Sequence, residues 1–321
     1  MAFSHDIADY PDGIVLPIDK PYRWTSADVI RKVKFAAIKH FRKKNLKVGH
    51  AGTLDPLATG VLLVCIGPAC KRAQEFQDHD KEYVAGIRFG ATTPSYDLEK
   101  EVDRTFPFDQ VTEEAVRAVL PSFLGTQEQV APLFSAKSVD GVRAYEMARR
   151  MYRNAQKGLT DPDFDAAALE TLHHSTITIS DIELIDFPEA STKVEASAVT
   201  PRTKTFSPEK RSKKFCPTPL ADATCFESIS SSVIPSGITA DAQKTASSRI
   251  NVADTSALGL PEARIRIACS KGTYIRAFAR DLGEALGTGA HLSSLVRTKT
   301  GTFRLEDALS LEEALALLAE G

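Results

Sequence analysis

The sequence predicts an α+β fold with a mixed β-sheet flanked by helices and loops. Segments with the apolar pattern of β-strands are interspersed with segments whose apolar residues recur every 3.6 residues, and no regular strand–helix–strand repeat runs through the chain. The chain has 321 residues, of which 43% are hydrophobic, so it is long enough to bury a sizeable core without disulfides or metals. We expect a single domain over 1–321, with its core at about 14–187 and 262–321.

Five segments are predicted to be β-strands. Residues 61–66 form a continuous apolar run, which is typical of a strand buried on both faces. Residues 81–90 and 176–187 alternate between apolar and polar side chains, the second with an irregularity at Ser180 and Asp181. Further strands are predicted at 264–269 and 291–299.

The helical segments are marked by their periodicity and by their ends. A basic helix begins at Ser26, which is a suitable cap, and its apolar side chains fall near one stripe. Another helix begins at Thr112, and Pro121 must kink or shorten it. Further helices are predicted at 143–156, from Thr273 onward and at 311–319.

Basic side chains gather near the start of the chain. Although the net charge is −2, residues 20–47 hold ten of the 40 basic side chains and only one of the 42 acidic ones, Asp28. A solvated helix face accounts for most charge runs, but this excess is beyond ordinary salt-bridge patterning. We therefore interpret the stretch as a phosphate-contacting surface.

Residues 189–260 differ in composition from the segments on either side. About three in ten of them are Ser or Thr, and no hydrophobic period persists. We interpret this segment as a flexible insertion into the domain. A solvated loop explains its basic cluster at 208–214 better than RNA contact does.

Several classes of protein are excluded by missing motifs. Five cysteines and seven histidines form no zinc-type spacing, and no glycine-rich phosphate loop is present. No apolar run approaches the ~18 residues of a membrane span, and the N-terminus lacks the pattern of a secretion signal. We expect a cytoplasmic protein that needs no cofactor or metal and contacts no membrane.

The segment with the greatest chemical interest is GHAGTLDPLATG at 49–60, which joins the basic helix to the strand at 61–66. It contains one carboxylate, Asp55, and Pro56 pushes this residue away from helical geometry. Gly52 lets the backbone approach a ligand closely. Composition alone still favours a structural turn.

The same segment resembles the catalytic motif of the TruB-type tRNA pseudouridine synthases, and the resemblance extends across about 14–187 and 262–303. It implies the pseudouridine synthase fold, with a mostly antiparallel mixed sheet, and a bacterial stand-alone enzyme. Several motifs of this length in the family's order make the resemblance highly specific. The other matching segments are DKP at 19–21, WTS at 24–26, KEY at 81–83, SA at 135–136, GVRAYEMAR at 141–149, CSKGTYIR at 269–276 and GTGAHLSSLVR at 287–297.

The resemblance implies that the T-loop uridine, position 55 of tRNA, is isomerised to pseudouridine. The N1–C1′ bond breaks and C5 joins C1′. Asp55 matches the family's essential aspartate, whose carboxylate either attacks or deprotonates the substrate sugar, and the sequence leaves both routes open. Arg276 would keep Asp55 ionised and oriented. Tyr83 would stack on the target uracil and help to remove the proton from C5.

Further residues are implied to bind the substrate. His50 would occupy the space that a flipped base leaves. Lys20, together with the basic helix, would hold phosphates. Leu295 would close the apolar wall of the uracil pocket. The remaining predicted binding residues are Gly52, Thr53 and Arg143.

The implied partner is the T-arm stem-loop of tRNA, without a guide RNA and with protein partners unknown. Residues 132–158 resemble the mobile arm that closes over the T-loop. The chain departs from the family at three points: Lys137 is displaced by one position, the insertion at 189–260 has no counterpart, and no C-terminal PUA domain follows Phe303. A tRNA-binding and folding module without required catalysis stays open as an alternative, as does an enzyme of the same fold for another RNA.

Overall fold

The computed structural model describes residues 3–132, 138–139, 142–143, 174–188, 250 and 252–319. Ten strands of these residues form one sheet: β1 (Ile14–Lys20), β2 (Val48–Ala51), β3 (Ala58–Ile66), β4 (Lys81–Phe89), β7 (Gly125–Val130), β10 (His174–Asp186), β11 (Glu262–Cys269), β12 (Ala290–Thr300), β13 (Phe303–Arg304) and β14 (Leu309–Ser310).

The sheet is mixed and mostly antiparallel, as the sequence predicts. Its order is β14-β1-β3-β12-β4-β11-β10-β7, with β2 beside β3 and β13 beside β12. Only β1 with β14 and β3 with β12 are parallel pairs within this sheet. Two short hairpins lie outside it: β5 (Ala91–Thr92) with β6 (Arg104–Thr105), and β8 (Ser138–Val139) with β9 (Val142–Arg143).

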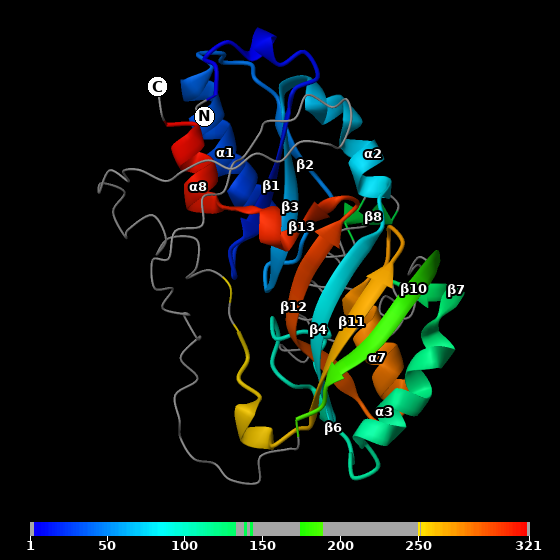
Figure 1. Ribbon diagram of the computed structural model, residues 1–321. Helices are drawn as coiled ribbons and strands as arrows, with labels where there is room; N and C mark the ends of the chain where they lie inside the picture. Colours follow the sequence, from blue (N-terminus) through cyan, green and yellow to red (C-terminus); the bar gives the residue numbers. More distant parts are fainter. Residues whose placement is uncertain are drawn as a thin grey trace, which may run out of the picture.

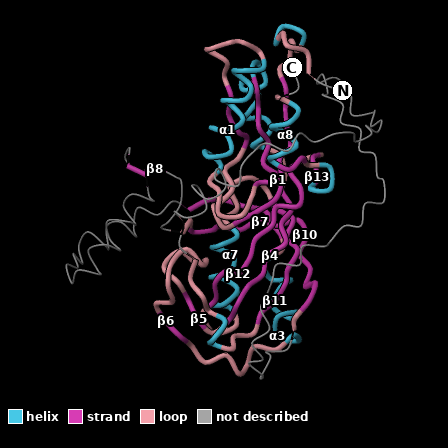
Figure 2. Tube along the Cα trace, turned by 90° about the vertical axis from the view of Figure 1, so that its left-hand side faces the viewer, coloured by secondary structure: helices cyan, strands magenta, loops and turns pink. Residues whose placement is uncertain are grey.

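The helices pack against opposite halves of the sheet. They are α1 (Ser26–His40), α2 (Ala73–Asp78), α3 (Glu113–Val119), α7 (Ile275–Ala285) and α8 (Leu311–Leu317). Figure 1 shows α1 and α8 together beside β1 and β3, and α3 and α7 near β11 and β10. Figure 2 shows from the side that α1 and α8 lie toward one end of the sheet and α3 toward the other. Within the described ranges, no helix is long and apolar enough to cross a membrane.

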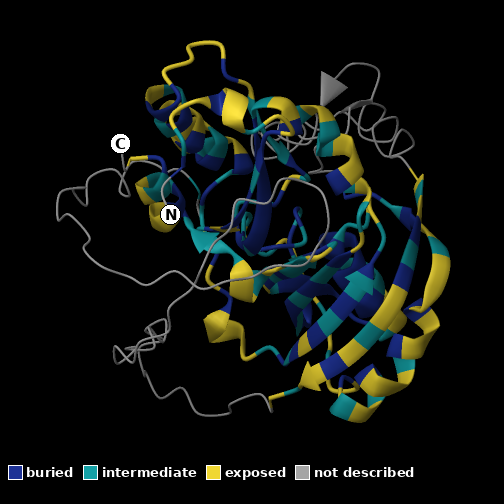
Figure 3. Ribbon diagram, turned by 45° about the horizontal axis from the view of Figure 1, so that its top comes forward, coloured by how far each residue is buried: buried dark blue, intermediate teal, exposed yellow. Residues whose placement is uncertain are grey.

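Two large hydrophobic clusters correspond to these halves. One joins β4, β11 and β12 to α7, and the other joins β1 and β3 to the inner faces of α1 and α8. Buried residues therefore follow the central strands, while exposed residues lie on the outer helices and loops (Figure 3). The junction of the two halves is the pairing of β3 with β12, and the loop that carries Asp55 leads directly into β3.

The five predicted strands and the helices that begin at Ser26, Thr112, near Thr273 and at 311 are confirmed in the described part of the chain. All five predicted strands are present, and the irregularity in β10 lies between Ile179 and Asp181. Thr112 caps α3, and Pro121 lies in a 3-10 turn that ends it. β1, β2, β7 and the two-residue strands have no counterpart among the predictions, because they are short or lack strict alternation.

Two expectations need correction. The prediction of a helix that begins at Arg143 is wrong at its first residue, because Val142–Arg143 pairs as a strand with Ser138–Val139. Most of that helix, and most of the arm expected at 132–158, lies outside the described residues. The range predicted for the insertion, 189–260, extends too far at its C-terminal end. Ala253 and Thr255 are 4% and 2% exposed and pack on the domain. Residues 189–249 lie outside the description.

Gly60 is required at the junction of the two halves. Its φ is +102°, and an added Cβ would lie 2.2 Å from the carbonyl oxygen of Arg297 on β12. We expect Gly60→Ala to lower the free energy of unfolding by at least ~2 kcal/mol, because both the left-handed conformation and the close approach are lost. A urea unfolding midpoint measures this. Gly49→Ala, which meets nothing within 4 Å, is the control and is expected to unfold like wild type. Equal midpoints for the two variants would contradict the packing argument.

Candidate active site

Asp55 lies in a loop between β2 and β3 that is held by hydrogen bonds on both sides. The Ser26 hydroxyl, at the first turn of α1, accepts from the Leu54 amide and donates to the Leu54 carbonyl, both at 3.0 Å. The Ala58 amide donates to the Asp55 carbonyl at 3.1 Å, and the Arg23 amide donates to the Pro56 carbonyl at 2.9 Å. The backbone of the loop is therefore fixed by its neighbours, although it belongs to no helix or strand.

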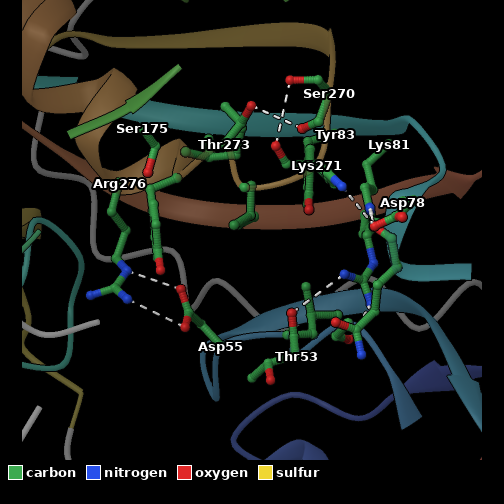
Figure 4. Close-up of a pocket in the computed structure, with 18 of the residues that line it drawn as sticks. Thr53, Asp55, Asp78, Lys81, Tyr83, Ser175, Ser270, Lys271, Thr273 and Arg276 are labelled. Carbon is green, nitrogen blue, oxygen red and sulfur yellow. Dashed lines mark hydrogen bonds and ion pairs between the residues drawn. The ribbon is translucent and has the colours of Figure 1, made fainter. Parts of the chain in front are cut away.

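The Asp55 carboxylate meets a buried arginine from α7. Arg276 donates from Nε to one Asp55 oxygen at 2.9 Å and from Nη2 to the other at 3.3 Å. Its Nη1 donates to the Ser95 carbonyl at 3.2 Å, and an oxygen of Asp97 lies 3.8 Å from Nε. Figure 4 shows the Arg276 and Asp55 side chains directed toward each other at one side of a pocket. The Arg276 side chain is 6% exposed and that of Asp55 is 36% exposed, so the carboxylate is the accessible member of the pair.

Two carboxylates therefore share one guanidinium. Burial alone would lower the pKa of Arg276, but Asp55 and Asp97 together raise it above its ordinary value. Burial raises the pKa of Asp97, and Arg276 opposes this shift. Asp97 is further held by the Ser95 hydroxyl at 2.6 Å and the Glu99 amide at 2.9 Å. The sequence analysis missed Asp97, and its local spacing contains no signal that marks it.

The pocket beside Asp55 has a volume of about 540 Å³. Asp55 and Arg276 lie on one side of it, and Lys81 and Asp78 lie on the other (Figure 4). Tyr83 lies between them on β4 and is 8% exposed, and burial raises the pKa of its phenol while Arg297 opposes this. The structure thus brings Asp55, Arg276 and Tyr83 to one cavity.

The predicted binding residues Gly52, Thr53 and Leu295 also line this pocket. Leu295 on β12 is 9% exposed and contributes an apolar wall. The carbonyls of Gly52 and Thr53 accept hydrogen bonds from Arg297 at 3.2 and 3.4 Å. Arg297 itself is 1% exposed and was not predicted as a site residue. It holds the start of the Asp55 loop against β12.

The expectation that Lys20 contacts phosphate is wrong. Lys20 is 0% exposed, and its Nζ donates to the carbonyls of Pro21, Trp24 and Pro56 at 2.9, 2.6 and 3.2 Å. Burial lowers its pKa to about 7, while Asp55 and Asp19 act in the opposite direction. Lys20 therefore stabilises the backbone around the Asp55 loop and is not available to bind a ligand.

Of the two remaining predicted residues, one lies outside the pocket wall and the other cannot be placed from the described residues. His50 lies on β2, next to the loop but outside the pocket lining, and burial lowers its pKa. Arg143 lies on β9, and its side chain is outside the described part of the structure. Among the described residues, no group of three or more His, Cys, Asp or Glu side chains is arranged to hold a metal ion.

Two family models match the chain. The model of the TruB family pseudouridylate synthase N-terminal domain matches residues 39–161, and that of the tRNA pseudouridylate synthase B C-terminal domain matches residues 276–320. The chain belongs to the TruB family of pseudouridylate synthases. The two matches contain Asp55, Tyr83 and Arg276, the residues that the pocket brings together.

Curated relatives agree with this family, and a solved structure shares the fold. Proteins named tRNA pseudouridine synthase B from Bacteroides thetaiotaomicron and Phocaeicola vulgatus are 40% and 38% identical to the chain over 304 residues, covering 95% of it and 92% of each relative. One from Flavobacterium johnsoniae is 33% identical over 311 residues, covering 96% and 98%. A chain in a crystal structure of a Cbf5–Nop10–Gar1 complex matches with a TM-score of 0.52 and 20% identity. The match covers 97% of this chain and 56% of that one, and it confirms the fold.

Replacing Lys20 with Met tests its role beneath the loop. The variant leaves three carbonyls without their donor, so we expect the free energy of unfolding at pH 7 to fall by about 2 kcal/mol. The folded-state pKa of about 7 lies below the ordinary value of 10.5, so the unfolded chain binds more protons between these pH values. Wild-type stability relative to Lys20→Met should therefore rise from pH 7 toward pH 9, by on the order of 1 kcal/mol per pH unit.

Urea unfolding of wild type and Lys20→Met at the two pH values measures this difference in stability. The contributions of groups that titrate alike in both proteins cancel in the comparison. Lys32→Met, at an exposed position of α1, is the control and should show neither effect. A wild-type advantage that does not change with pH would contradict the burial of a titrating amine.

Proposed function

We propose that this protein is a stand-alone tRNA pseudouridine synthase that converts the T-loop uridine, position 55 of tRNA, to pseudouridine. The observation that carries the proposal is the accessible Asp55 carboxylate, oriented by the buried Arg276 at the mouth of a pocket of about 540 Å³. Family membership supports the reaction type. The relatives named tRNA pseudouridine synthase B support tRNA as the substrate, since the chain covers more than nine tenths of their length.

The reaction is an isomerisation, so its atoms balance without a second substrate. The N1–C1′ bond breaks, the uracil turns, and the C5–C1′ bond forms. C5 then loses a proton while N1 gains one. In our proposal the Asp55 carboxylate starts the reaction by attacking or deprotonating the ribose, and Arg276 orients it through two hydrogen bonds. No group in this sequence of steps has to be oxidised, reduced or hydrolysed.

Tyr83, which lies between the two sides of the pocket, supplies a ring surface. Because burial raises the pKa of its phenol, the hydroxyl stays protonated at neutral pH and is a poor base. We therefore assign Tyr83 chiefly to stacking on the uracil, and a minor part in removing the C5 proton. Leu295 adds an apolar contact for the flipped base. We propose that the T-arm stem-loop enters without a guide RNA, and the relatives named tRNA pseudouridine synthase B support this.

The decisive variant is Asp55→Asn. We expect it to bind unmodified tRNA as wild type does and to form no pseudouridine, because the amide can neither attack nor deprotonate the sugar. Nucleoside mass spectrometry of tRNA after incubation measures the product, and a filter-binding assay measures affinity. Asp12→Asn, an exposed position outside the pocket, should retain full activity.

The possible outcomes separate the alternatives. Normal turnover by Asp55→Asn would overturn the assignment of the carboxylate. Tight binding by wild type without any product would favour a tRNA-binding and folding module. Modification of unrelated hairpins in preference to a T-arm stem-loop would favour an enzyme for another RNA.

A further inference from the structure

Eight of the ten basic side chains at 20–47 are exposed, and they lie on α1 and the turn after it. We call this set of residues the α1 basic face. No acidic residue lies between Asp28 and Asp55, and every basic residue in that interval is exposed. The residues of the α1 basic face are Arg31, Lys32, Lys34, Lys39, Arg42, Lys43, Lys44 and Lys47.

The charges of this face are not neutralised by neighbouring residues. Arg31 pairs with Asp28 at 2.8 Å, and the other seven form no ion pair with a described residue. Acidic groups on the elements packed against α1 are engaged elsewhere. Asp6 accepts from the Ala8 amide, Asp9 accepts from the Ser4 hydroxyl, and Glu313 of α8 accepts from the Ser310 amide. The α1 basic face therefore has an unbalanced positive charge on a chain whose remainder is acidic.

The face also carries an aromatic side chain with no packing role. Phe35 is 75% exposed, on the side of α1 opposite to the buried residues Val33 and Ala37. An exposed aromatic ring among cations is typical of nucleic-acid contact, because it packs on ribose or base while the cations meet phosphates.

The position of the face relative to Asp55 decides which part of an RNA reaches it. α1 begins at Ser26, which bonds to Leu54 of the Asp55 loop, and leads away from the loop toward the end where the N-terminus lies (Figure 1). Its 15 residues extend for about 22 Å. The far end of α1 therefore meets RNA well away from the nucleotide that enters the pocket. Lys39, Lys43 and Lys44 lie at or beyond the far end of α1.

We propose that the α1 basic face is a second RNA-binding surface, which contacts the phosphate backbone of the tRNA outside the T-arm. The inference rests on the proposed function, since that function brings a whole tRNA to Asp55. The face supplies affinity and orientation for the tRNA body, while the pocket supplies the chemistry.

The test compares full-length unmodified tRNA with an isolated T-arm stem-loop, each bound by wild type and by the variant Lys39→Gln/Lys43→Gln/Lys44→Gln. We expect the variant to bind full-length tRNA about tenfold more weakly at low salt, with the slope of log affinity against log salt reduced by roughly 2 to 3. Its affinity and turnover for the T-arm stem-loop should equal those of wild type. The matched control Arg104→Gln/Arg117→Gln/Arg304→Gln removes the same charge from exposed positions elsewhere and should bind both RNAs normally.

Each other result overturns the inference. If the triple lysine variant bound full-length tRNA with the affinity and salt slope of wild type, the α1 basic face would not bind RNA. An acidic protein surface would then be the partner that its charge favours. Equal weakening for both RNAs would place the contact on the T-arm itself. If the control variant bound full-length tRNA as weakly as the lysine variant does, the loss of affinity would come from the lower net charge of the protein and not from the α1 basic face. If wild type bound tRNA and made no pseudouridine, the proposed function would fail while the binding comparison still decided the role of the face.

Discussion

The hydrogen bonds from Arg276 to Asp55 are the interaction on which this structure depends. A guanidinium that is 6% exposed needs compensating charge, and it finds two carboxylates and the Ser95 carbonyl. Asp97 is buried, whereas Asp55 faces the pocket. The arginine thus joins a buried carboxylate to an accessible one. This arrangement orients Asp55 while leaving its oxygens within reach of a substrate.

The loop that carries Asp55 is irregular, and buried side chains hold its shape. The Ser26 hydroxyl donates to the Leu54 carbonyl, and Lys20 donates to the Pro56 carbonyl. Arg297 donates to the carbonyls at the start of the loop. These donors come from both halves of the fold, because Lys20 ends β1 and Arg297 lies on β12. Since β3 and β12 pair at the junction, the position of the loop depends on the register between the two halves. The active-site geometry is in this sense a property of the whole sheet.

Sequence reasoning succeeded where a local pattern carries the information. The apolar run of β3 and the alternation of β4 and β10 predicted these strands, and the resemblance to the TruB family predicted that Asp55, Tyr83 and Arg276 share a site. Asp97 was missed because its role arises only when the turn after β5 meets α7. Lys20 was misassigned for a related reason: the basic residues of α1 are exposed, but contacts with Trp24 and Pro56 bury the amine of Lys20. Long-range contacts decide such cases, and no spacing within the chain records them.

The central claim is that Arg276 orients the accessible Asp55 carboxylate for the reaction. The most direct measurement is single-turnover release of tritium from C5-labelled uridine in unmodified tRNA, by wild type and by Arg276→Lys. A lysine cannot reproduce the two parallel hydrogen bonds of a guanidinium, so the account predicts unchanged tRNA binding and release at least about tenfold slower, equivalent to ~1.4 kcal/mol in the barrier. Release at the wild-type rate by a folded, tRNA-binding Arg276→Lys protein would contradict the account.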